Sequence, residues 1–137
     1  MNDVEYRTHM SLWSMLAAPL LASNDMHTIT PETLAILTNR DVIAIDQDEL
    51  GKPGHGISKD GDREVWTRQL AGGDWAIALF NRGDQPAEMG VTPKDLGIAR
   101  FAKMRDLWQH ATVEPSPRFS AQVPAHGVVM LRVTPGK

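Results

Sequence analysis

Apolar residues in the first fifty positions recur at the spacing of an α-helix. One apolar face near the start is formed by Tyr6, Met10, Trp13, Leu16 and Ala17. Asn2 can cap this helix, because Glu5 stands at its third position and completes a capping box. Pro19 lacks a backbone N–H and clashes with the preceding turn, so we expect it to end the helix.

Shorter elements are expected next. Leu20–Ser23 predicts a short buried strand and Asn24-Asp25 a polar turn. Thr30-Pro31-Glu32 predicts a helix start, and the helical pattern then continues to Ile45 with a break at Asn39. One strand cannot satisfy its own backbone groups, so we interpret this half as part of a larger α/β layer. The alternative is a small α+β domain in which that strand joins a later sheet.

The rest of the chain changes to short runs of β-forming residues. The expected strands are Glu64–Leu70, Trp75–Asn81, Ala87–Val91, Arg100–Trp108, Arg118–Val123 and Val128–Val133. Their number and spacing predict an antiparallel sandwich or barrel, so the chain is expected to be mainly β. Residues 75–80 are apolar on both faces and predict a central strand. Gly72-Gly73 predicts a hairpin to the preceding strand.

Composition places the boundary between the halves near residues 51–56. All 11 glycines lie at or after Gly51, where the segment Gly51–Gly56 is typical of a connector. The expected organisation is therefore residues 1–50, a connector at 51–56, and a β domain at 57–137. The net charge of the 137 residues is only −3.

These bulk properties exclude several classes of function. A nucleic-acid partner is not expected, because phosphate binding needs a concentrated Lys/Arg surface. The sequence has no cysteine, which excludes disulfides and thiolate catalysis. Its longest apolar run, Met15–Ala22, is too short to span a membrane. No cofactor is indicated, and the compartment stays open.

Pairs of carboxylates are the first candidates for catalytic residues. Catalysis by a carboxylate pair, with one group as nucleophile and the other as acid/base, needs the two carboxyl groups about 5–5.5 Å apart. Asp46 and Asp48 are close in sequence, but two residues apart on a helix they diverge by roughly 200° around its axis. We therefore expect capping or turn roles for them. The histidines have no metal-ligand spacing, so no metal site is predicted.

Other motifs have structural interpretations that outweigh functional ones. Arg82-Gly83-Asp84 resembles a cell-adhesion tripeptide, but its position between two expected strands favours a hairpin turn. Pro124–Gly127, with His126, predicts a strand-connecting turn. Tryptophans of a small sandwich usually pack in the core, although they can also stack on sugars. The three in question are Trp66, Trp75 and Trp108.

Several segments resemble, in order, the melibiase-type α-galactosidases. Those in the first half are Glu5–His9, Ser11–Trp13, Ala17–Leu21, Ser23–Asp25, Thr38–Asp48 and Leu50-Gly51. Those in the second half are Ala78–Arg82, Arg105–Trp108 and Val123–Gly127. The similarity covers essentially the whole chain, and several independent motifs in register are far more specific than any one alone.

The resemblance implies a catalytic (β/α)₈ barrel followed by an antiparallel β-sandwich. Residues 1–50 would be the last helix–strand–helix portion of the barrel. The family's two catalytic aspartates and its main galactose contacts lie on earlier strands, so no residue of this chain is assigned to them. Ser23, Asn24 and Asp25 would lie at the barrel mouth and are candidates for supporting the substrate site. Met1 falls where relatives often have an internal methionine, which suggests an incomplete reading frame.

Three hypotheses follow. The first is the C-terminal part of an α-galactosidase, a retaining hydrolase of terminal α-linked galactose, inactive alone. The second is a non-catalytic module that binds carbohydrate on exposed aromatics. In the third, which we prefer for residues 57–137, the sandwich only supports the barrel. The implied partner is the missing N-terminal barrel, and α-galactosides would bind only to the complete enzyme. An exposed stripe on the first helix would also favour self-association.

Overall fold

The computed structural model describes residues 3–15, 31–37, 39–48, 50 and 52–136. The helices are α1 (Asp3–Met15), α2 (Pro31–Leu37) and α3 (Arg40–Asp46), and two short 3₁₀ turns span Ala71–Gly73 and Pro93–Leu96. The strands are β1 (His55–Asp60), β2 (Arg63–Gln69), β3 (Trp75–Asn81), β4 (Ala87–Val91), β5 (Arg100–Asp106), β6 (Ala111–Val113), β7 (Phe119–Val123) and β8 (Val128–Gly136).

The strands form a two-layered antiparallel sandwich. A six-stranded sheet has the order β1-β2-β3-β8-β5-β6, and β4 pairs with β7 in a second sheet. Side chains from both sheets meet in one core, in which Ile77 and Leu79 of β3 pack with Met89 of β4 and Val123 of β7. The expected mainly-β sandwich is therefore confirmed.

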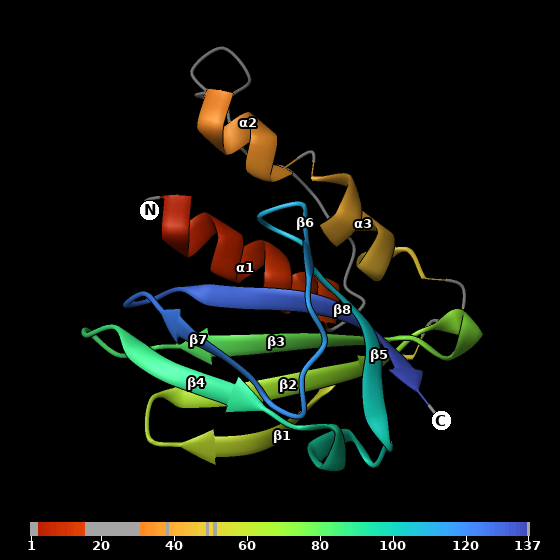
Figure 1. Ribbon diagram of the computed structural model, residues 1–137. Helices are drawn as coiled ribbons and strands as arrows, with labels where there is room; N and C mark the ends of the chain where they lie inside the picture. Colours follow the sequence, from red (N-terminus) through yellow and green to blue (C-terminus); the bar gives the residue numbers. More distant parts are fainter. Residues whose placement is uncertain (1–2, 16–30, 38, 49, 51, 137) are drawn as a thin grey trace.

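The central strand β3 buries both of its faces, as predicted. Ile77 and Leu79 point between the sheets, whereas Ala76, Ala78 and Phe80 point outward and are also inaccessible to water. Alternating residues of a strand point to opposite faces, so a strand covered on both sides must be apolar throughout. The cover on the outer side is provided by the helices (Figure 1).

Helices α1 and α3 pack on the outer face of the large sheet. Met15 of α1 and Ile45 of α3 join Phe80 and Met130 of the sheet in a second buried cluster. The break expected at Asn39 is confirmed, because its side chain accepts a hydrogen bond from the amide of Val42 and caps α3. Asn39 therefore begins a separate helix after α2.

The expectation of an exposed stripe on α1 is wrong for the residues that the structure describes. Met10 is 3% exposed, and Tyr6 is half-buried. The physical reason is that α1 packs against the sheet and also against α2 and α3, so this chain itself provides the cover. The large apolar side chains that remain exposed in the described ranges are Leu34 and Leu50. The described residues do not include Leu16, Ala17, Pro19 or the expected strand Leu20–Ser23. The side chain of Trp13 is not described either.

Two strands were not expected, and one turn was misassigned. Strand β1 begins at His55, inside the expected connector, and β6 has only three residues. Arg82-Gly83-Asp84 does not close a hairpin, because β3 and β4 belong to different sheets. The Asn81 side-chain amide explains the crossing, since it donates to the carbonyl oxygens of Gln85 (2.8 Å) and Val123 (3.1 Å) and directs the chain toward β7.

Candidate functional site

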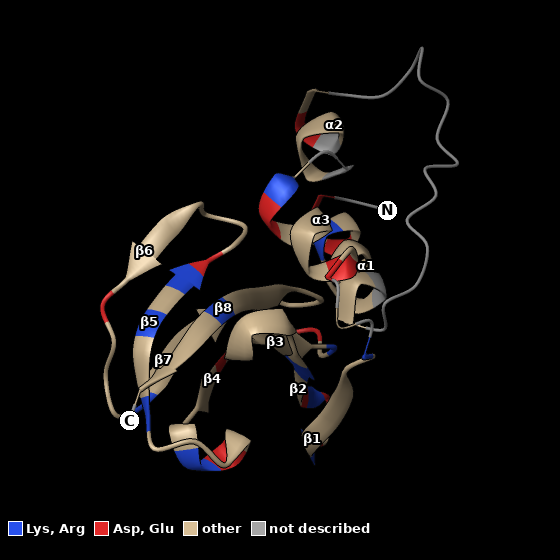
Figure 2. Ribbon diagram, turned by 90° about the vertical axis from the view of Figure 1, so that its right-hand side faces the viewer, with Lys and Arg blue, Asp and Glu red and all other residues tan. Residues whose placement is uncertain are grey.

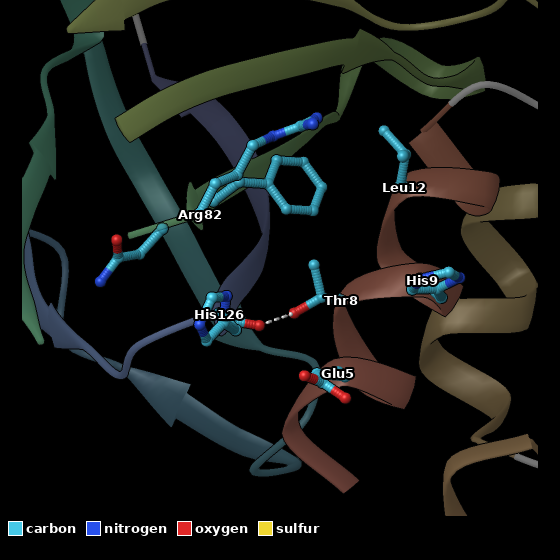
Figure 3. A pocket seen from close by; sticks show the side chains of 8 residues that line it. Glu5, Thr8, His9, Leu12, Arg82 and His126 are labelled. Atoms are coloured by element: carbon cyan, nitrogen blue, oxygen red, sulfur yellow. Dashed lines mark hydrogen bonds between the residues drawn. The ribbon is translucent and has the colours of Figure 1, made fainter. Parts of the chain in front are cut away.

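A hollow lies between α1 and the end of β3 (Figure 3). Its volume is about 570 Å³, in the range of small-ligand pockets. The lining residues come from three elements: Glu5, Thr8, His9 and Leu12 from α1, Phe80, Asn81 and Arg82 from the end of β3, and His126 from the turn before β8.

Polar contacts hold the rim of this hollow in place. The Thr8 hydroxyl donates to the carbonyl oxygen of His126 at 2.8 Å, which ties α1 to the sandwich (Figure 3). His126 has a φ of 57°, and its Nε2 lies 2.8 Å from a carboxylate oxygen of Asp84. The Nε of Arg82 lies 2.6 Å from a carboxylate oxygen of Glu64. His126 therefore lies in a strand-connecting turn, as predicted.

The hollow does not have the groups that glycoside hydrolysis requires. Its described lining contains one carboxylate, Glu5. Hydrolysis with retention needs a nucleophile and an acid/base on opposite sides of the bond. The hollow can accommodate a ligand, but the residues that line it do not form a catalytic pair.

A second hollow, of about 390 Å³, does gather carboxylates. It is lined by Asp60 at the end of β1, Asp62 in the β1–β2 turn and Asp84 in the β3–β4 connection. All three are exposed, and Asp84 is 91% exposed and paired with His126. A glycosidase acid stays protonated near neutral pH because burial raises its pKa. These exposed turn residues lack that environment.

The structure separates Asp46 from Asp48. Burial raises the pKa of Asp46, and this effect exceeds the opposing hydrogen bond from Gln47 and the charge of Arg68. Asp48 accepts hydrogen bonds from the amides of Leu50 (3.1 Å) and Ala71 (2.8 Å). The predicted turn role is therefore confirmed for Asp48, whereas Asp46 is a buried residue at the end of α3.

Sequence analysis missed Arg68, the most deeply buried charged residue among those that the structure describes. Its guanidinium donates to the carbonyl oxygens of Ser14 in α1 (2.8 Å), Lys52 (2.7 Å) and Ile45 in α3. Two of these carbonyls belong to the last turns of helices, where the dipole favours a cation. The only signal in the sequence was an arginine two positions from Trp66 on the same face of β2. Arg68 therefore fixes both helices to the sheet.

A second polar cluster joins α3 to the segment after β5. Asn39 donates to the carbonyl oxygen of Leu107 at 3.1 Å. Asp41 accepts hydrogen bonds from Arg105 (3.1 and 3.2 Å) and lies 2.7 Å from Nδ1 of His110. Burial alone would raise the pKa of Asp41, but the hydrogen bonds from His110 and Arg105 outweigh it and lower the pKa below its usual 3.8.

Gly54 brings the connector against α1. Its amide donates to the carbonyl oxygen of Met15, and a Cβ at this position would lie 2.7 Å from that oxygen and 2.8 Å from the Thr67 oxygen. Only glycine allows so close an approach of backbones. The end of α1, the connector and β2 are therefore in direct contact.

In the described ranges no group of three His, Cys, Asp or Glu side chains could hold a metal ion. None of α1, α2 and α3 has the length and apolar character needed to cross a bilayer. Ser23, Asn24 and Asp25, the barrel-mouth candidates, lie outside the described residues.

Comparison with known proteins decides the family. Residues 60–133, more than half of the chain, match the family described as "Alpha galactosidase C-terminal beta sandwich domain". Residues 1–48 match the family described as "Alpha galactosidase A". The chain belongs to the α-galactosidase (melibiase) family.

Plant α-galactosidases are among its similar relatives. The chain is 40% identical to α-galactosidase 3 of Arabidopsis thaliana, with 98% of the chain and 32% of the relative aligned. It is 39% identical to the α-galactosidase of Coffea arabica, with 98% of the chain and 36% of the relative aligned. The chain therefore spans about a third of the length of these α-galactosidases and corresponds to their C-terminal part.

Solved structures of the family share the same arrangement. Superposition on α-galactosidase I from Mortierella vinacea gives a TM-score of 0.94 at 34% identity, over 99% of this chain and 36% of the other. A β-L-arabinopyranosidase from Geobacillus stearothermophilus gives 0.90 at 27% identity, over 100% and 32%. The same helix-and-sandwich unit thus occurs in α-galactosidases and in an enzyme named for a different sugar.

In the described part of this α-galactosidase family member, the three tryptophans of the sandwich do not form an exposed platform. Trp66 and Trp108 pack beside the helix–sheet cluster, and Trp75 packs against the core between the sheets. Trp66 also meets Phe80 edge-on, with ring centroids 6.5 Å apart, and the indole N–H of Trp108 donates to the Ser11 hydroxyl at 2.8 Å. The carbohydrate-binding module is therefore not favoured.

Proposed function

We propose that this chain acts as the C-terminal part of an α-galactosidase, in which the β-sandwich supports the catalytic barrel. The observation that carries this proposal is the match of two α-galactosidase family models in chain order, across residues 1–48 and 60–133. In this proposal residues 1–50 close the barrel, residues 51–56 connect the two parts and already include the start of β1 at His55, and residues 57–137 form the supporting sandwich.

The contacts between helices and sheet support the structural role. Arg68, Asn39 and Asp41 each bond across the junction between the helical segment and the sandwich. These polar contacts have defined geometry, whereas apolar contacts alone tolerate sliding. A sandwich joined to the last barrel helices in this way would limit their movement relative to the rest of a barrel.

The chemistry of the complete enzyme would be hydrolysis of terminal α-linked galactose with retention. One aspartate would attack the anomeric carbon while the other protonated the leaving oxygen, and water would then release the galactosyl group. We propose that both aspartates, and the implied barrel partner, belong to the part of the enzyme that precedes residues 1–50. The isolated chain would then be inactive.

A direct assay tests this inactivity. The purified 137-residue protein is expected to release no nitrophenol from an aryl α-galactoside, because no buried pair of carboxylates is present in its described hollows. The coffee α-galactosidase, assayed in parallel, shows that the assay works. Turnover by the purified chain that survives further purification would contradict the proposal.

A chimera tests the supporting role itself. The corresponding C-terminal third of the coffee α-galactosidase is replaced by this chain, and the chimera is expected to hydrolyse the same substrate with unchanged preference for galactosides over N-acetylgalactosaminides. Ser23, Asn24 and Asp25 are proposed to support the substrate site, so their replacement by alanine in the chimera should raise KM. A chimera that folds but has no activity would contradict the proposal.

A further inference from the structure

Cationic side chains collect on the part of the outer sheet face that the helices leave open. Arg105 of β5 lies directly opposite Arg132 of β8 in the antiparallel register, and Thr112 of β6 lies opposite Arg105 on the other side. In the next row Lys103 of β5 lies opposite Thr134 of β8. Figure 2 shows Lys and Arg positions in blue on the neighbouring strands β5 and β8.

An arginine pair in this register needs compensation. Like charges directly opposite on antiparallel strands are destabilising. Each arginine is paired with one carboxylate: Asp41 of α3 for Arg105, at 3.1 Å, and Asp74 of the β2–β3 connection for Arg132, at 3.0 Å. The two carboxylates balance the arginines and leave the charge of Lys103 in excess.

Several donors in this row remain available. Asp41 uses Nε and Nη2 of Arg105, and Asp74 uses Nε of Arg132. In the described part of the chain, Nη1 of Arg105, both Nη atoms of Arg132 and Nζ of Lys103 have no hydrogen-bond acceptor. Guanidinium groups present their N–H donors in a planar fork that matches the oxygens of phosphate, sulfate or carboxylate.

These groups share a hollow of about 370 Å³. Its walls include the four residues Lys103, Arg105, Arg132 and Asp74, together with Thr112 and Thr134. A threonine hydroxyl can donate to an oxyanion in addition to the cations. We propose that this hollow, the β5–β8 cation site, binds a small oxyanion, either free or carried on a sugar.

The first experiment uses inorganic sulfate as the probe. ¹H–¹⁵N spectra of the whole chain are recorded during a sodium sulfate titration, with sodium chloride holding the ionic strength constant. We expect saturable shifts of the amides of Lys103, Thr112 and Thr134. Shifts that rise linearly without saturation, or that chloride reproduces, would overturn the site.

A matched pair of variants separates the site from general charge attraction. Lys103→Gln removes the excess cation and should weaken sulfate binding about tenfold, the loss expected for one charge-assisted hydrogen bond. Lys59→Gln removes the same charge from β1, at the opposite edge of the six-stranded sheet, and should leave binding unchanged. Both residues are exposed, so both variants should keep the thermal midpoint of the parent. Equal weakening by the two substitutions would refute the proposal.

Sugar probes identify the source of the oxyanion. If galactose 6-sulfate binds more tightly than inorganic sulfate and shifts the same amides, the natural oxyanion is carried on a glycan. Equal affinities of the two probes support a free ion. Saturable binding of unsulfated galactose at these amides would overturn an oxyanion site. Neither result depends on the barrel, so failure here leaves the proposed α-galactosidase role intact.

Discussion

At the scale of single residues, the junction between helices and sandwich depends on a buried arginine. Arg68 is 1% exposed and bonds to three backbone carbonyls from three separate segments. Its Nη2 atom and one carboxylate oxygen of Asp46 have no partner among the described residues. A buried charge is stabilising only when its partners are in place. Arg68 should therefore be far less replaceable than Arg63, the other arginine of β2.

Replacing Arg68 by methionine tests this dependence. Arg68→Met keeps an apolar stem of similar length but leaves the carbonyls of Ser14, Ile45 and Lys52 without a donor, so the free energy of unfolding should fall by about 2–4 kcal/mol. Urea denaturation followed by tryptophan fluorescence measures the change. Arg63→Met, at the exposed start of the same strand, is the control and should change the midpoint little. Equal losses in both variants would argue against a specific role.

At the scale of elements, the sequence pattern predicted the buried central strand accurately and missed an exposed edge strand. Strand β3 was predicted with its observed bounds, because both of its faces are apolar. Strand β1 was missed because Ile57 is its only half-buried apolar residue and the rest are exposed. Both β1 and the three-residue β6 are sheet edges, where one side lacks a strand partner and the hydrophobic pattern is weak.

Pairing between elements was harder to predict than the elements themselves. The prediction of a hairpin at Arg82-Gly83-Asp84 was wrong because Asn81, just before it, donates hydrogen bonds to Gln85 and to Val123. Val123 is 42 residues away in the sequence, so this contact could not be read from the local pattern. For the same reason the sequence identified Asp48 as a turn residue, whose contact with Leu50 is local, but gave no sign of the long-range role of Arg68. Contacts between segments distant in sequence leave no periodic signal.

The attachment of α3 to the β5–β6 region should depend on pH. The lowered pKa of Asp41 means that its interactions with Arg105 and His110 stabilise the fold above pH 3.8 and are lost as pH falls through the lower folded value. Asp41→Asn should therefore lower the free energy of unfolding by about 1 kcal/mol at pH 5 and by much less at pH 2.5. Thermal unfolding at the two pH values measures both differences.

Asp60→Asn is the matched control for this pH test. Asp60 lies exposed at the end of β1 and has no ion pair in the described ranges, so its substitution should have little effect at either pH. If Asp41→Asn lowers the free energy of unfolding by the same amount at pH 5 and at pH 2.5, the carboxylate charge is not what stabilises the junction.

At the scale of the whole molecule, the helical segment and the sandwich share one apolar cluster. Phe80, Leu107 and Met130 of the sandwich are at most 1% exposed, and Met15, Val42 and Ile45 of the helices pack with them. Because the cover comes from within the chain, helices α1 and α3 protect the outer sheet face in addition to any role in a barrel. The sandwich without them would present a contiguous apolar patch, the kind of surface that drives association.

One substitution, Met130→Gln, made both in the full chain and in a chain without the helices, tests this shared cluster. A chain shortened to residues 52–137 should bind a hydrophobic dye and elute as larger species than the full chain in size-exclusion chromatography. Met130→Gln should reduce both properties in the shortened chain, because the outer face of β8 is then open to water. In the full chain the same substitution buries an amide and should lower the free energy of unfolding by about 2–3 kcal/mol. If Met130→Gln instead destabilised both chains equally, Met130 would belong to the core between the sheets and the helices would not be its cover.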